Sequence, residues 1–95
     1  MPKGYVIARA IVTDPEAWSA YAAKASEAIE AYGGTPMVRG GRSEVVEGEG
    51  RARNVVIEFE SFEQARAYAH SDEYAEARRL RAHAGVVDLI IVEGA

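Results

Sequence analysis

The sequence contains no cysteine, only two histidines and no excess of basic residues. The absence of cysteine excludes disulfides, thiolate chemistry and the common cysteine-containing zinc sites. The histidines, His70 and His83, match no metal-binding spacing with each other or with Asp72, so we expect no metal. A net charge of −4 argues against nucleic acid as a partner, because phosphate binding needs a concentrated basic face.

Long apolar runs and nucleotide-binding motifs are missing as well. The longest apolar stretch, residues 86–92, is interrupted by Asp88 and is far shorter than the ~20 residues that span a bilayer. The first residues lead into a strand without the apolar core of a signal peptide. There is no phosphate-binding loop or dinucleotide fingerprint, and neither glycine pair, 33–34 nor 40–41, precedes a helix. We therefore expect a cytoplasmic protein that uses no membrane and no cofactor.

The size and composition of the chain indicate a thin core. The 95 residues are the length of one domain, and 1–95 is predicted to be a single domain. Such a short chain buries only about 60–65% of its unfolded surface. Hydrophobic residues make up 48% of the sequence, but 18 residues are alanine, which contributes little buried area. Association with a partner would therefore add stability.

Alternating apolar residues and helix-capping signals predict the order β-α-β-β-α-β. Asp14 and Pro15 start the first helix and Gly33 ends it, while Ser61 and Gln64 form a capping box before the second helical region. A Gly-Glu-Gly-Arg turn at 48–51 is expected to close a hairpin. The predicted strands are 5–12, 35–47, 54–60 and 86–94, and the predicted helices are 15–32, 62–70 and 71–84. This order predicts an α+β, ferredoxin-like fold: a four-stranded antiparallel sheet with its helices on one face.

The other face of this sheet has no cover within the chain. Strands one and four carry apolar residues on both alternating faces, as Ile7 with Ala8 and Ile90 with Ile91 show. Helices cover only one of these faces, and no further helix is predicted. The natural cover is the same face of a second copy, so we expect a homodimer.

Three stretches of the chain resemble the domain of unknown function 1330 family of small bacterial proteins, within the dimeric α/β-barrel superfamily: "KGYVIARAIVTDPEAWSAYAAKASEAIEAYGGTPMVRGGRSEVVEG", "RNVVIEFESFEQARAYAHSDEYAEARRLR" and "DLIIVEG". The most specific pieces are Tyr-Gly-Gly, Val-Arg-Gly-Gly, Glu-Phe-Glu-Ser-Phe and Ser71-x-x-Tyr74. The resemblance implies a dimeric barrel with a cavity between sheet and helices in each subunit.

The resemblance does not imply one reaction. The superfamily includes cofactor-independent monooxygenases, muconolactone isomerase-like enzymes, haem-degrading enzymes and the ligand domains of transcription regulators. The haem-degrading relatives rely on an Asn, Trp and His set. Asn54, Trp18 and His70 are present here but do not fall on matching elements, so haem is not expected.

Arg39, followed by the glycine pair, is the leading ligand-binding candidate. The glycines would allow a bulge and close approach of a ligand, with Gly40 at the site, and the Arg39 guanidinium would present a planar donor fork to a carboxylate or enolate. The alternative is an edge-strand bulge that blunts pairing, with a solvated arginine.

Arg9 and Glu58 interrupt apolar strands that should be neighbours, and they could form a structural ion pair if their faces agree. Alternatively, Glu58 is a cavity carboxylate with a raised pKa that acts as a base, and Arg9 contacts the ligand. Tyr21 lies on the inward stripe of the first helix beside Trp18, which is consistent with core packing. In the functional alternative, Tyr21 and Tyr74 point their hydroxyls into the cavity beside Trp18 and orient a ligand oxygen.

These candidates support two hypotheses. The first is a cofactor-free enzyme, monooxygenase-like or isomerase-like, that acts on a small anionic or enolisable molecule; Arg39 would bind charge, and Glu58 or Tyr21 would handle a proton. The second is a non-catalytic ligand-binding or structural dimer. A catalytic site needs a titratable group that faces its ligand, whereas a binding module does not.

Overall fold

The computed structural model describes residues 2–95, and these form the predicted β-α-β-β-α-β order, with two short helices in the second helical region. The strands are β1 (Gly4–Val12), β2 (Thr35–Arg39), β3 (Arg53–Phe59) and β4 (Gly85–Glu93). The helices are α1 (Pro15–Ala31), α2 (Phe62–Ala69) and α3 (Asp72–Arg79). No helix in this part of the chain is long and apolar enough to cross a membrane.

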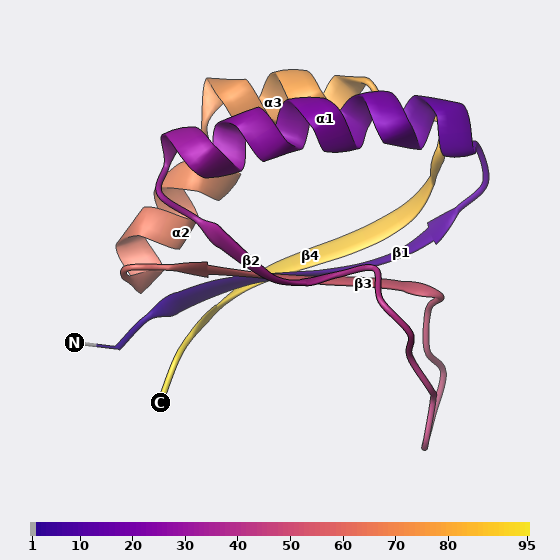
Figure 1. Cartoon of the computed structure of the whole chain (residues 1–95), viewed down its shortest axis with the longest axis horizontal. Coiled ribbons are helices and arrows are strands. Elements are labelled where there is room, and N and C mark those ends of the chain that lie inside the picture. Colours follow the sequence, from indigo (N-terminus) through magenta and orange to yellow (C-terminus); the bar gives the residue numbers. More distant parts are fainter. Residues whose placement is uncertain (1) are drawn as a thin grey trace.

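The four strands form one antiparallel sheet in the order β2-β3-β1-β4. All three helices lie on the same face of this sheet (Figure 1). This is the ferredoxin-like α+β fold that the sequence predicts. The core sits between the layers, where Val6, Ala10, Ile57 and Phe59 of the inner sheet face are buried against the helices.

The helix starts form as the capping residues predict. The Asp14 carboxylate accepts a hydrogen bond from the Ala17 N–H at 3.2 Å, and the Ser61 hydroxyl accepts one from the Gln64 N–H at 3.1 Å. The second half of the predicted capping box does not form. Instead, the Gln64 Nε2 donates to the Tyr32 carbonyl at 2.9 Å and so satisfies the end of α1.

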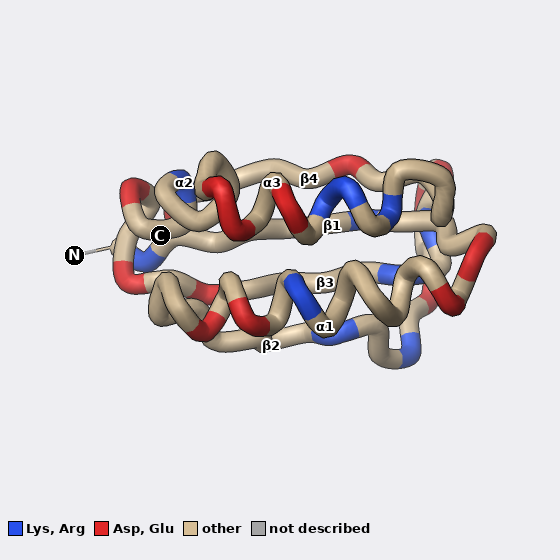
Figure 2. Tube along the Cα trace, turned by 90° about the horizontal axis from the view of Figure 1, so that it is seen from above, with Lys and Arg blue, Asp and Glu red and all other residues tan. Residues whose placement is uncertain are grey.

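The charges of α3 match its dipole, because acidic residues occupy its first turn and basic residues its last (Figure 2). Its N-cap, Ser71, accepts from the Tyr74 N–H at 3.0 Å and donates to the Tyr68 carbonyl at 2.7 Å. This one buried hydroxyl therefore joins α2 to α3 and fixes the bend between them. Tyr74 is held in the core as a result.

The second strand is shorter than predicted. β2 ends at Arg39 rather than at residue 47, because Gly40 adopts a φ of 66° and turns the chain out of the sheet. Residues 40–52, which we call the arm, contain neither helix nor strand and project from the sheet on the side opposite the helices (Figure 1). β2 and β3 pair as the predicted antiparallel hairpin, but residues 40–52 join them in place of the predicted turn at 48–51. A bulge does occur, but at Met37, between the paired residues Pro36 and Val38.

The outer sheet face, away from the helices, carries an apolar row with one residue from each strand. Val38 pairs with Val56, Val56 with Ile7, and Ile7 with Ile90. The two ends of this row are exposed, Val38 by 43% and Ile90 by 55%. The bare face expected from the sequence is therefore present.

Arg9 and Glu58 both belong to the outer face, but they do not meet. Arg9 lies opposite Asn54, whereas Glu58 lies opposite Tyr5, so the two are four positions apart in the register of β1 and β3. The predicted ion pair between them does not form, because neighbouring strands place only opposite and diagonal residues in contact.

Candidate functional site

A cavity of about 70 Å³ lies between α1 and the inner face of the sheet. Its walls are mainly apolar, and α1 contributes Trp18 and Tyr21 to them. Two arginines, Arg39 from β2 and Arg53 from β3, also line it. This volume is well below the roughly 300–1,000 Å³ of sites for drug-sized ligands, so the cavity holds at most a very small molecule or one end of a larger one. The resemblance implied a cavity at this place, between the sheet and the helices.

The bulge at Met37 directs Arg39 into this cavity. Pro36 pairs with Ile57 of the inner face, and strict alternation from Pro36 would put Arg39 on the outer face. The extra residue shifts the alternation by one, so that Arg39 pairs with Val55, another residue that lines the cavity. Arg39 is exposed overall, so it lies at the rim of the cavity.

Arg53 also lines the cavity, although it was not among the residues predicted from the sequence. Its guanidinium carbon lies 5.8 Å from the centre of the Trp18 ring, a cation–π distance. The guanidinium also packs against Gly40, where a Cβ atom would collide with Arg53 Nη1. Gly40 itself does not line the cavity, but the absence of a side chain there leaves room for Arg53. The available signal was the alternation of Arg53 with the inner-face residues Val55 and Ile57.

Buried donors beside the cavity lack partners. Trp18 Nε1 and Arg53 Nε are buried and have no hydrogen-bond acceptor within residues 2–95. The ion pairs in that part of the chain are Lys3–Glu60 and Arg51–Asp88, so neither cavity arginine is paired with a carboxylate. A buried donor without an acceptor is costly, and a ligand that supplied acceptors would remove this cost.

Tyr21 and Tyr74 lie side by side, but only Tyr21 lines the cavity, so the alternative in which both hydroxyls point into it is not met. Their hydroxyl oxygens are 3.1 Å apart, and Arg81 Nη2 donates to the Tyr74 hydroxyl at 3.2 Å. The Arg81 guanidinium also lies over the Tyr21 ring, 5.0 Å from its centre. Burial, together with the adjacent Tyr74, raises the pKa of Tyr21 far above its usual range, so Tyr21 remains a neutral phenol.

Glu58 and Arg9 lie on the outer face and do not line this cavity. The Tyr5 hydroxyl donates to Glu58 Oε2 at 3.0 Å, and this hydrogen bond is the main cause of the raised pKa of Tyr5. Arg9 Nη2 donates to the Glu49 carbonyl of the arm at 3.2 Å. The expected placement of Glu58 and Arg9 beside a ligand in the cavity is therefore wrong. No Asp, Glu or His among residues 2–95 lines it.

Comparison with known families and structures shows the family of the chain and relatives of its fold. Residues 3–95 match the family described as Domain of unknown function (DUF1330). The chain therefore belongs to this family, as the resemblance in its sequence indicated. No curated protein matches the chain.

Solved structures share the fold at low sequence identity. A protein of unknown function from Rhodopseudomonas palustris has 18% identity and a TM-score of 0.79, with 99% of this chain and 83% of that chain covered. A dimeric ferredoxin-like protein of unknown function from Thermobifida fusca has 17% identity and a TM-score of 0.62, over 99% of this chain and 91% of that one. A proposed antibiotic biosynthesis monooxygenase from Nitrosomonas europaea has 14% identity and a TM-score of 0.56, over 98% and 89%.

Proposed function

We propose that this protein is a homodimer in which each subunit binds a small organic anion in the cavity between α1 and the sheet. The observation that carries this proposal is the presence of two arginines, Arg39 and Arg53, without a carboxylate partner at an apolar cavity. A carboxylate or enolate on the ligand would supply the missing charge, because the planar guanidinium binds such groups with two parallel hydrogen bonds.

The rest of the cavity favours an apolar body on the ligand. Trp18, Val55 and Ile57 line it, and the unpartnered Trp18 Nε1 offers one further hydrogen bond. Apolar burial would contribute roughly 25 cal/mol per Å² of surface removed from water. A compact aromatic or branched carboxylate combines these properties.

Trp18 makes the test direct, since it is the single tryptophan of the chain and it lines the cavity. We expect benzoate and phenylacetate to change its fluorescence with a saturating dependence on concentration. The neutral analogue benzamide should bind at least tenfold more weakly, because it lacks the charge that the two arginines would pair. Equal binding of benzoate and benzamide would contradict the proposal.

Substitution of a cavity arginine distinguishes binding in the cavity from nonspecific binding elsewhere on the protein. We expect Arg53→Met to weaken benzoate binding at least tenfold, because loss of a charge-assisted hydrogen bond costs about 1.5–3 kcal/mol. The matched control is Arg42→Met, which removes an arginine of the arm that does not line the cavity. Unchanged affinity in Arg53→Met, with the fold retained by circular dichroism, would exclude this cavity as the site.

Cofactor-free catalysis is the second candidate, and the observation that favours it is the state of Tyr21. As a neutral phenol that lines the cavity, Tyr21 can donate a hydrogen bond to an enolate oxygen, but it cannot serve as a base near neutral pH. Such chemistry would need a substrate that is already an anion or loses its proton readily. The similarity to the proposed monooxygenase from Nitrosomonas europaea agrees with this candidate. Tyr21→Phe would abolish turnover in a catalytic protein and spare benzoate binding in a purely binding one.

Dimerisation through the outer face is supported by the apolar row and by relatives. Structures from Thermobifida fusca and Bacteroides fragilis with this fold are described as dimeric. A second sheet placed against the row of Val38, Val56, Ile7 and Ile90 would cover apolar side chains that the helices leave bare.

A further inference from the structure

We propose that the arm, residues 40–52, docks on the second copy of the chain and buries Val45 and Val46 there. This inference rests on the homodimer proposed above, and it assigns an interaction surface to a segment outside the sheet. The two valines are the most conspicuous apolar residues of the arm, with Val45 55% and Val46 84% exposed in the single chain. Adjacent exposed valines on a projecting segment are typical of a surface that is buried by a binding partner.

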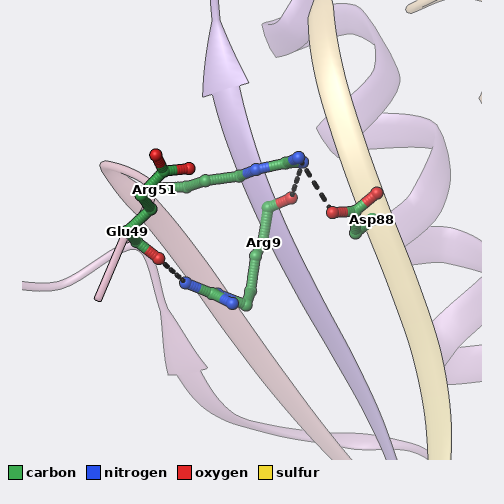
Figure 3. Close-up of polar contacts among 4 residues, drawn as sticks. All are labelled: Arg9, Glu49, Arg51 and Asp88. Atoms are coloured by element: carbon green, nitrogen blue, oxygen red, sulfur yellow. Dashed lines mark hydrogen bonds and ion pairs between the residues drawn. The ribbon is translucent and has the colours of Figure 1, made fainter. Parts of the chain in front are cut away.

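Three contacts fix the base of the arm against the outer face of the sheet (Figure 3). Arg51 Nη2 forms an ion pair with Asp88 of β4 at 2.8 Å, and Arg51 Nη1 donates to the Arg9 carbonyl of β1 at 3.2 Å. Arg9 in turn donates to the Glu49 carbonyl of the arm. Because these partners come from two neighbouring strands, the arm has a defined direction relative to the sheet.

The arm also packs on itself. A Cβ atom at Gly50 would collide with the Val45 side chain, so the two halves of the arm lie against each other at this point. The arm nevertheless stands away from the sheet and leaves a hollow of about 520 Å³, which Arg9, Asn54, Val45 and Val46 help to line. Side chains of a second molecule can enter this hollow.

The dimensions favour a second copy as the occupant. Packed sheets lie about 10 Å apart, whereas residues 40–46 can extend up to roughly 20 Å, so the arm reaches the level of a second sheet on the outer face. The arm leaves the sheet directly after Val38 and Arg39, and Val38 ends the apolar row. The arm surface is thus continuous with the proposed dimer face. Glu44 and Glu47 flank the valines, which disfavours a nucleic acid as the partner.

Photo-crosslinking tests this inference because the chain has no cysteine of its own. Val46→Cys, labelled with a benzophenone maleimide, is mixed in equal amounts as ¹⁴N and ¹⁵N protein, allowed to exchange subunits, and irradiated. We expect crosslinked peptides that join a light chain to a heavy chain. The matched control is Ser19→Cys on the exposed surface of α1, which should give no light–heavy crosslinks.

Sedimentation velocity of the unmodified protein distinguishes the failure of this inference from the failure of the dimer. Crosslinks that join light to heavy chains support the docking of the arm. A dimer whose Val46 crosslinks stay within one chain would overturn the role of the arm and leave the dimer intact. A monomer would overturn the dimer and the arm docking together.

Discussion

Tyr21 and Tyr68 show how burial sets the chemistry of single residues in this protein. Tyr68 is 1% exposed and Tyr21 8%, and burial raises the pKa of both phenols well above 10. In the unfolded chain each phenol loses its proton near pH 10. The folded state therefore holds these protons more tightly than the unfolded state does in alkaline solution.

This difference predicts a loss of stability at high pH. The contribution of each phenol is fully present below about pH 10, and the free energy of unfolding then falls with pH by up to about 1.4 kcal/mol per unit for each buried tyrosine. Urea unfolding between pH 8 and 12 should show this fall, and Tyr68→Phe should reduce its slope. Native-state absorbance at 295 nm provides the check. If all five tyrosines ionised below pH 11 in the folded protein, the explanation would be wrong.

At the same scale, the sequence predicted some cavity residues and missed others. Trp18 and Tyr21 were found because the helical period of α1 places them on the inward face. Arg39 was proposed from its chemistry, but its direction depends on a bulge at Met37 that no local signal marks. Glu58 was expected to face the cavity but lies on the outer face. Because β3 has apolar residues on both faces, its sequence alone does not show which face is covered by the helices. Arg53 was missed since its predicted strand began one residue too late.

At the level of strands and helices, the start of β1 lies so close to the start of α2 that Gly4 has no room for a side chain. A Cβ atom at Gly4 would collide with the Ser61 carbonyl and would lie 2.7 Å from Phe62 Cα. Both obstacles are backbone atoms, so they cannot move aside as a flexible side chain could. This glycine therefore sets how closely the helix approaches the sheet.

We expect Gly4→Ala to lower the free energy of unfolding by about 1–3 kcal/mol or more, as overpacking does. The matched control is Gly41→Ala in the arm, where an added Cβ meets no atom within 4 Å. This control should stay within about 0.5 kcal/mol of the wild type. Urea unfolding of both variants gives the comparison, and equal midpoints would refute the proposed backbone contact.

Local sequence patterns predicted the starts of the helices but not the end of the second strand. Helix starts at Asp14, Ser61 and Ser71 were correct, because capping depends on neighbours within one turn. The second strand was extended wrongly to residue 47, since Val45 and Val46 have the composition of a strand. Both valines are exposed, because a strand-like composition does not form a strand without a neighbouring strand to pair with.

For the whole molecule, the proposed dimer face can be tested by a charge in the apolar row. Ile90 is 55% exposed in the single chain, so Ile90→Lys should leave the monomer folded. In the dimer it would bury an unpaired charge, and we expect a monomer at concentrations where the wild type is dimeric. Sedimentation velocity measures this. Leu80→Lys, at a comparably exposed leucine that ends α3, is the control and should remain dimeric.

The pairing of the first and last strands brings residues near the two ends of the chain side by side. Gly4 pairs with Glu93 across β1 and β4, and the Gly94 N–H donates to the Lys3 carbonyl at 2.7 Å. In Figure 1, the start of β1 and the end of β4 accordingly lie on the same side of the molecule. A short linker could join them, and the chain could be reopened in the arm without cutting any strand or helix. The protein is thus suited to circular permutation, in which β3 would become the first strand and β2 the last while every strand pair stayed the same.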